Sequence, residues 1–154
     1  MDGFEALDQV DRQIIAALQL DGRRTVTSLA TDLDIPASSV RYRMKRLEDA
    51  GVLQIVGIAN PLAIGFDRLA LIHLTVRPTT AHAVCKVVSE MPETSYVVMT
   101  SGRFDVLAEV ICRDVAHFVD VVDRIAAVDG VMSTESSFVL EVHKLAYGWG
   151  VPGA

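Results

Sequence analysis

The stretch from Ile35 to Leu47 concentrates side chains that can bind nucleic acid. It carries four cations, Arg41, Arg43, Lys45 and Arg46, and no acidic residue, in a chain whose formal net charge is −6. Lysine and arginine bind phosphates, and short hydroxyl side chains near the start of a helix can approach phosphates or base edges in a major groove. The residue types in this stretch therefore predict a helix that binds DNA.

The apolar positions of the same stretch predict how that helix would pack. Val40, Met44 and Leu47 follow i, i+4, i+7 spacing and form one stripe that would face a core. The opposite face is polar, and Arg43 lies nearer the buried edge. We expect base edges to be contacted by Ser38, Ser39, Arg41 and Tyr42, and phosphates by Arg43, Lys45 and Arg46.

An ordinary amphipathic surface helix with a solvated basic face would show the same pattern, so the residues before it matter. Leu7–Leu20 has apolar residues at helical spacing with Asp8 as a predicted N-cap, and Val26–Leu33 is a second helical pattern that Thr25 can cap. Only the short turn 34–36 separates the second helix from the basic one, as in a helix-turn-helix. Three short helices with these gaps predict a DNA-binding unit.

The composition predicts a globular protein without a general affinity for nucleic acid. The chain of 154 residues is 51% hydrophobic and 22% charged, with a sequence pI near 5.1. Its first residues include several acids and no apolar signal segment, and no apolar run approaches the ~18 residues of a membrane span. We expect a cytoplasmic protein with no membrane partner, whose DNA contact is focused on one helix and duplicated by dimerisation.

A domain boundary is predicted after the basic helix. Val52–Ala59 has a strand-like pattern, and the residue before Pro61 is disfavoured in a helix. We expect a helix-turn-helix domain at 1–51, a wing or linker strand at 52–65 and a second domain at 66–154.

The second domain repeats one pattern of strand, helix and strand. The expected strands are Leu69–Arg77, Tyr96–Ser101, Asp105–Arg113 and Val131–Leu145, and the expected helices are Thr80–Met91 and Val115–Val128. This βαββαβ order predicts a ferredoxin-like, antiparallel sheet with both helices on one face, so the chain as a whole is α+β. The first strand is apolar on both sides, and a second copy of the sheet is its expected cover, which predicts an obligate dimer.

Four motifs spread along the chain together resemble a known family. They are Leu7-Asp8-x-x-Asp11-Arg12-x-Ile14-Ile15, Leu47-Glu48-x-x-Gly51-Val52, Asn60-Pro61 with Gly65, and Ser101-Gly102-Arg103-Phe104-Asp105. The family is that of the Lrp/AsnC, or feast/famine, transcriptional regulators. The resemblance implies a winged helix-turn-helix followed by a βαββαβ, RAM-type ligand-binding domain. It also implies dimers that often assemble into octamers, and an effector, usually an amino acid, bound at contacts between dimers.

The motif Gly102, Arg103, Phe104 and Asp105 lies in a turn that we expect to join two central strands. On sequence alone, a plain hairpin whose glycine supplies a positive φ explains it. The resemblance implies instead that the turn lines the effector site and that the Asp position affects the response to ligand. We predict that Asp105 is needed for the response but not for the fold. The hydroxyls of Thr134 and Ser136 would line the same site, and strand alternation sends them to the opposite side from Ser137.

The remaining motifs predict no catalytic site, metal site or cofactor. Gly148–Gly153 matches GxGxxG as a string but lacks the surrounding strand and helix, so we expect a flexible tail that Trp149 could anchor on a partner. Lone helical pairs of histidine with aspartate or cysteine are typical of solvated faces. Cys85 and Cys112 are expected to be buried, reduced thiols.

Two alternatives to a ligand-responsive regulator remain open. Sirohaem decarboxylases share the implied architecture, but such an enzyme would have a histidine-lined pocket and a weakened DNA helix, whereas here the basic helix is intact and the four histidines are scattered. An architectural DNA-binding protein would keep the helix without an effector.

Pro36 and Tyr42 depart from the family, which commonly has a serine or threonine N-cap and a basic residue at these positions, so the resemblance does not extend to a particular operator sequence.

Overall fold

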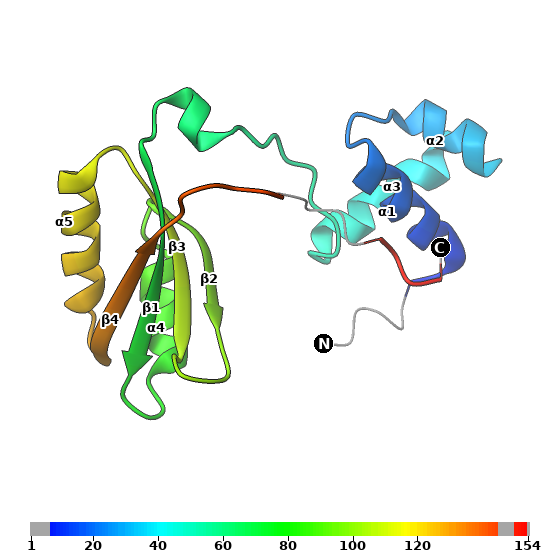
Figure 1. Cartoon of the computed structure of the whole chain (residues 1–154). Coiled ribbons are helices and arrows are strands. Elements are labelled where there is room, and N and C mark those ends of the chain that lie inside the picture. Colours follow the sequence, from blue (N-terminus) through cyan, green and yellow to red (C-terminus); the bar gives the residue numbers. More distant parts are fainter. Residues whose placement is uncertain (1–6, 145–149, 154) are drawn as a thin grey trace. The chain divides into compact units, whose positions relative to one another are not determined.

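The computed structural model describes residues 7–144 and 150–153, and the chain divides into two compact units (Figure 1). One unit is Met1–Ile58 with Lys144–Ala154, and the other is Ala59–His143. This division is not the one expected from the sequence. Leu53 and Val151 pack against the helices of the first unit and so join the linker segment and the tail to that unit. No described helix is long and apolar enough to cross a membrane.

The first unit is a bundle of three short helices around one small core. The helices are α1 (Gln9–Leu20), α2 (Val26–Leu33) and α3 (Ala37–Asp49). Ile14, Leu29 and Val40, one from each helix, are fully buried together. The side chain of Asp8 accepts a hydrogen bond from the backbone N–H of Asp11, and that of Thr25 accepts one from Ser28, so both expected N-caps are confirmed.

The expected strand over Val52–Ala59 is wrong. Residues 53–60 have no regular secondary structure, and a short 3-10 helix, η1 (Pro61–Ile64), follows them. A strand needs a neighbour to pair its N–H and C=O groups, and the described residues of the first unit contain no strand. The segment therefore forms no strand in the described chain, and Ile55, Val56 and Ile58 are exposed.

The second unit has the expected βαββαβ order. Its elements are β1 (Arg68–Val76), α4 (Ala81–Ser89), β2 (Thr94–Met99), β3 (Val106–Cys112), α5 (Val115–Ala126) and β4 (Val131–Phe138). The sheet is antiparallel in the order β2-β3-β1-β4. Two expectations need correction. β2 is an edge strand rather than a central one, and β4 ends at Phe138, short of the expected end, where its register with β1 ends opposite Ala70.

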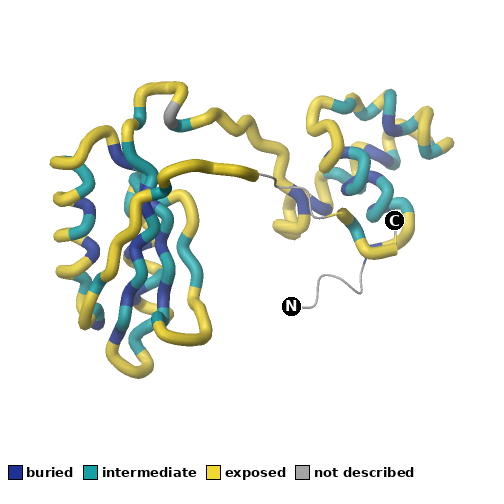
Figure 2. Tube along the Cα trace, viewed as in Figure 1, coloured by how far each residue is buried: buried dark blue, intermediate teal, exposed yellow. Residues whose placement is uncertain are grey.

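The two faces of this sheet have different surroundings. Ala70, Ile72 and Leu74 of β1 are fully buried on the face that both α4 and α5 cover, and Figure 2 shows the buried positions alternating along the central strands. On the other face, here called the open face, β1 carries Leu71 and His73. These residues are only partly buried in the single chain, so the open face is available to a partner.

The described part of the C-terminal tail, 150–153, belongs to the first unit. Val151 packs against the helical core, and a shallow hollow there is lined by Leu7, Ile15, Gln19, Val52, Gly150, Val151 and Pro152. This placement differs from the expected flexible tail, because an apolar side chain and a proline find an apolar surface to cover. Trp149, the expected anchor, lies outside the described residues.

Candidate functional site

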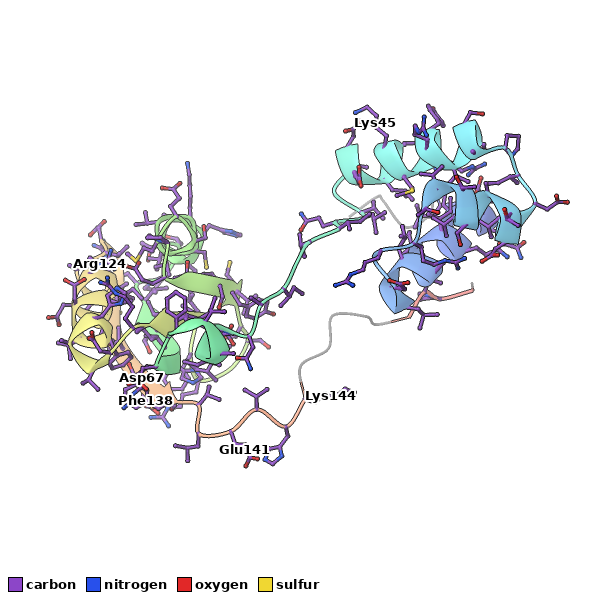
Figure 3. All side chains as sticks on the ribbon, turned by 90° about the horizontal axis from the view of Figure 1, so that it is seen from above. Lys45, Asp67, Arg124, Phe138, Glu141 and Lys144 are labelled. Carbon is purple, nitrogen blue, oxygen red and sulfur yellow. The ribbon has the colours of Figure 1, made fainter. Side chains whose placement is uncertain are left out.

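Helix α3 presents a polar face to solvent because its apolar stripe is buried. Val40 and Leu47 are almost completely buried against α1 and α2, and Met44 packs beside them. The opposite face carries Tyr42, whose exposed fraction is 69%, and Lys45, which lies on the side of α3 away from α1 (Figure 3). Because the apolar stripe packs in the core, the polar face of α3 lies at the surface, where a binding partner can contact it.

The seven residues expected to contact DNA fall into two groups. Five are exposed, namely Ser38, Arg41, Tyr42, Lys45 and Arg46, and two are partly buried, namely Ser39 and Arg43. Pro36 occupies the N-cap position without a side-chain capping bond, so the first N–H groups of α3 are not capped by that residue. A helix start of this kind leaves backbone donors to approach a phosphate.

Two arginines of α3 are paired with acidic residues of α1. The guanidinium of Arg43 lies 2.6 Å from Oδ2 of Asp8 and 2.8 Å from Oδ1 of Asp11, while Arg46 contacts the other oxygen of Asp11. The backbone N–H of Asp11 and the guanidinium of Arg43 hold the pKa of Asp8 below its ordinary value. These partners differ from the expected role of both arginines in phosphate binding.

Sequence reasoning did not identify Asp11 as part of this site. A signal was present, because Asp8 and Asp11 are three residues apart, as are Arg43 and Arg46, and residues i and i+3 share one face of a helix. Two matching pairs of opposite charge on helices expected to pack together are a pattern typical of a helix-to-helix ion-pair cluster.

The turn between β2 and β3 is held against the open face of the sheet. The ring of Phe104 lies 4.8 Å from that of His73, and the guanidinium of Arg103 lies 4.9 Å from the Phe104 centroid. Arg103 also forms an ion pair with Glu135 of β4, at 3.2 Å. Gly102 has a φ of 131° and no atom within 4 Å of where a Cβ would stand, so its backbone is open to a close approach.

Asp105 has a role within the sheet. Its Oδ2 atom accepts a hydrogen bond from the backbone N–H of Val76, at 2.9 Å, and its own N–H donates to the carbonyl of Leu74. The backbone N–H of Thr100 in turn donates to the carbonyl of Asp105. The expectation that Asp105 is not needed for the fold is therefore at odds with its contacts.

Thr134 and Ser136 are not brought together with Arg103. They stand opposite Leu74 and Ile72 in the register of β4 with β1, and so lie on the face that the helices cover. Glu135 stands opposite His73 and lies on the open face, where it reaches Arg103. Alternation along β4 therefore separates the expected hydroxyl lining from the turn, and places Glu135 beside it instead.

A second ion-pair cluster connects the residue before β2 to α5. Oε1 of Glu93 lies 2.6 Å from Arg124 and 3.2 Å from Nε2 of His117. Burial alone would raise the pKa of Glu93, but hydrogen bonds from its own backbone, His117 and Arg124 outweigh it and hold the pKa below its ordinary value. Arg113 donates to Nδ1 of His117, which assigns the His117 proton to Nε2.

The thiols and the metal-binding residue types form no reactive centre in the part of the chain that the structure describes. Cys85 and Cys112 are free, and burial raises the pKa of both thiols, which favours the unreactive protonated form. Among residues 7–144 and 150–153, no three His, Cys, Asp or Glu side chains converge as a metal site would require.

Comparison with known proteins matches both units. The model of the winged helix-turn-helix DNA-binding domain matches residues 7–54, and that of the Lrp/AsnC ligand binding domain matches residues 69–149. An uncharacterised HTH-type transcriptional regulator of Pyrococcus abyssi is 30% identical over 92% of this chain and 90% of its own length. The DNA-binding transcriptional activator DecR of Escherichia coli is 30% identical over 88% of this chain and 92% of its own length.

Solved structures agree in fold. The leucine response regulatory protein of Mycobacterium tuberculosis superposes with a TM-score of 0.82 at 27% identity, covering 95% of this chain and 100% of that one. A transcriptional regulator of Neisseria meningitidis in complex with L-methionine gives a TM-score of 0.75 at 29% identity, covering 91% and 94%. With its DNA-binding helix-turn-helix and its ligand-binding domain, the chain belongs to the Lrp/AsnC family of transcriptional regulators.

Proposed function

We propose that this regulator binds a pseudo-palindromic site in double-stranded DNA by placing α3 of each protomer in the major groove. The observation that carries the proposal is the exposed face of α3, where Ser38, Arg41, Tyr42 and Lys45 stand opposite a buried apolar stripe. A helix with one apolar face in the core and one polar face at the surface is the element that helix-turn-helix proteins place in the major groove. Two copies related by a two-fold axis would read two half-sites, which is why the site is expected to be pseudo-palindromic.

We further propose that an amino acid is the effector and that it binds beside the turn Gly102–Asp105. The ion pair of Arg103 with Glu135 is exposed, with side-chain exposures of 78% and 55%, and such pairs contribute little to stability. An amino acid carries one carboxylate and one ammonium group, so it can replace each partner of this pair. The structural relative from Neisseria meningitidis was solved with L-methionine, which agrees with this ligand class.

The working form is proposed to be a cytoplasmic homo-oligomer built on a dimer, with octamers as the larger assembly. The support is the open face, where Leu71, Leu107 and Ile111 are partly buried, and no helix among the described residues covers them. A sheet face that carries several uncovered apolar side chains is usually covered in soluble proteins. A symmetric partner covers it without needing another protein.

A binding role rather than catalysis is proposed for the second unit. A sirohaem-decarboxylase-like activity would need histidines gathered at one pocket. Here His73 lies on the open face, His82 on α4, His117 at the start of α5 and His143 after β4. A strong visible absorption band in the purified protein would contradict the proposal.

Selection from a pool of random duplexes tests DNA binding. One enriched pseudo-palindrome is expected, and the double variant Arg41→Ala/Lys45→Ala should fail to enrich it while keeping the wild-type melting temperature, because both side chains are exposed. Failure of the wild type to enrich any sequence would contradict sequence-specific binding.

A thermal-shift screen of the twenty amino acids tests the effector. A ligand at ~100 times its dissociation constant adds about 2.7 kcal/mol to the free energy of unfolding, which is a readily measured rise in melting temperature. If none of the amino acids shifts the melting temperature, the amino-acid effector is wrong, and an effector-independent DNA-binding protein is favoured.

A further inference from the structure

Asp11 is a buried carboxylate on α1, and two guanidinium groups of α3 surround it. Its side chain is 0% exposed. Oδ1 accepts from Arg43 at 2.8 Å, Oδ2 accepts from Arg46, and the backbone N–H of Asp8 donates to Oδ2 at 3.3 Å. Both carboxylate oxygens are therefore bound by groups inside the protein.

Because this negative charge is buried, both arginines are needed to bind it. A carboxylate taken out of water is costly unless opposite charges and hydrogen bonds replace its hydration. Moving either arginine to a DNA phosphate would leave Asp11 with one charged partner fewer, in a place that water does not reach. The side chain of Arg43 is further restricted by Asp8, at 2.6 Å, and is only 23% exposed.

We infer that Asp11 is a positioning residue for DNA recognition, which holds Arg43 and Arg46 on α1 and thereby keeps both cations away from phosphates. The inference rests on the proposed binding of DNA through α3. In this arrangement the two arginines hold α3 against α1. Arg41 and Lys45 remain on the outer face of α3 to contact DNA. Asp11 itself touches no DNA in this arrangement.

Withholding two cations changes how much of the binding free energy comes from phosphates and how much from bases. Phosphate contacts strengthen binding to every sequence alike, whereas base contacts strengthen binding to the operator alone. A recognition helix that presented all four of its cations to phosphates would gain affinity for random DNA as much as for its site. By holding two of them, Asp11 lowers affinity for random DNA and for the operator alike, so base contacts supply a larger share of the binding free energy at the operator.

The salt dependence of duplex binding separates held cations from phosphate-binding cations. Each phosphate contact contributes about 0.9 to the slope of log affinity against log salt concentration. Arg46→Gln and Lys45→Gln are a matched pair, because they remove the same charge from adjacent positions of α3. The slope on random DNA should stay at the wild-type value in Arg46→Gln and should fall by about 0.9 in Lys45→Gln.

Asp11→Asn tests the inference in the other direction. It releases the two arginines while keeping the size of the side chain, so affinity for random DNA should rise and the slope should steepen by about one to two. Asp21→Asn removes the same charge from an exposed residue at the end of α1, whose side chain accepts a hydrogen bond from the backbone N–H of Arg23, and it should change neither the affinity for random DNA nor the slope. Circular dichroism and melting establish that each variant is folded.

Failure of the inference and failure of the proposed DNA binding would give different results. If the wild type binds DNA and Arg46→Gln lowers the slope as much as Lys45→Gln does, Arg46 contacts phosphate and the inference is overturned, even if Asp11→Asn does not fold. If the wild type binds no duplex at any salt concentration, the proposed function fails and the inference fails with it.

Discussion

The carboxylate of Asp105 accepts a hydrogen bond from the backbone N–H of Val76, at 2.9 Å, and so ties the turn after β2 to the end of β1. The register of β1 with β4 shifts between Thr75 and Val76, and this irregularity lies next to the bonded N–H group. Asp105 therefore belongs to the fold as well as to the region proposed to bind the effector.

Asp105→Ala should destabilise the protein with and without effector. Val76 is buried, and loss of its acceptor leaves an unsatisfied N–H group, which costs about 1–3 kcal/mol. Asp105→Asn keeps an acceptor oxygen and should lose less. Denaturant unfolding, without effector and at one fixed effector concentration, measures the loss of stability in both variants. A wild-type unfolding free energy in Asp105→Ala would show that the bond to Val76 contributes nothing.

Arg103→Gln should weaken effector binding without lowering stability. The side chain is exposed and its ion pair with Glu135 contributes at most about 1 kcal/mol, whereas a charge-assisted bond to an effector carboxylate contributes more. The effector-induced rise in melting temperature should shrink while the midpoint without effector stays. Arg77→Gln removes a comparable surface pair, with Asp129, and serves as the control. An equal effector response in both variants would place the ligand elsewhere.

Tyr42→Ala should weaken binding to the selected operator more than binding to random DNA. Tyr42 is 69% exposed on α3, and loss of a base contact costs about 1–3 kcal/mol on the cognate site alone. Tyr42→Phe separates the ring from its hydroxyl. Fluorescence anisotropy on the two duplexes gives both affinities, and equal losses on the two would remove Tyr42 from the base-contacting set.

Leu71→Lys should convert the proposed dimer to a monomer. Leu71 lies on the open face opposite Glu109, so the new ammonium gains a partner within the chain while a charge replaces apolar surface at the interface. Leu71→Ile is the conservative control. Light scattering measures the mass. A dimer of unchanged mass in the lysine variant would show that assembly uses another surface.

Glu93→Gln should flatten the loss of stability in acid. The folded-state pKa of Glu93 is lowered, so its charged form stabilises the second unit above the ordinary carboxyl pKa of about 4.3, and that contribution is lost as the pH falls through the lower folded value. Unfolding free energies between pH 3 and 6 measure the difference. Parallel curves for wild type and variant would mean that the cluster with Arg124 and His117 does not contribute.

The elements of this fold were predictable because their signals are local. The bounds of α2 are those expected, and Asp8 and Thr25 cap the first two helices as expected. The errors concern partners distant in sequence. Among residues 7–144 and 150–153, no strand lies beside the segment 52–59, so it is not a strand. β2 is an edge strand because β1 pairs with the other side of β3.

The sites were predictable in residue type more than in geometry. The four cations of α3 are visible in the sequence, but the assignment of Arg43 and Arg46 depends on Asp11, which lies 32 and 35 residues away. Likewise, alternation separates Thr134 from Glu135, but only the register with β1 shows which of them faces the turn. Such facts are set by packing between elements, which local patterns do not encode.

The return of the tail to the first unit makes the second unit an insertion within the DNA-binding one. A fragment that ends at Ile58 therefore lacks Val151 and Pro152, and it leaves Leu7, Ile15 and Val52 without their cover. To isolate the helix-turn-helix intact, 59–143 would have to be excised and the two remaining segments joined by a short linker, rather than the chain being truncated after its linker segment.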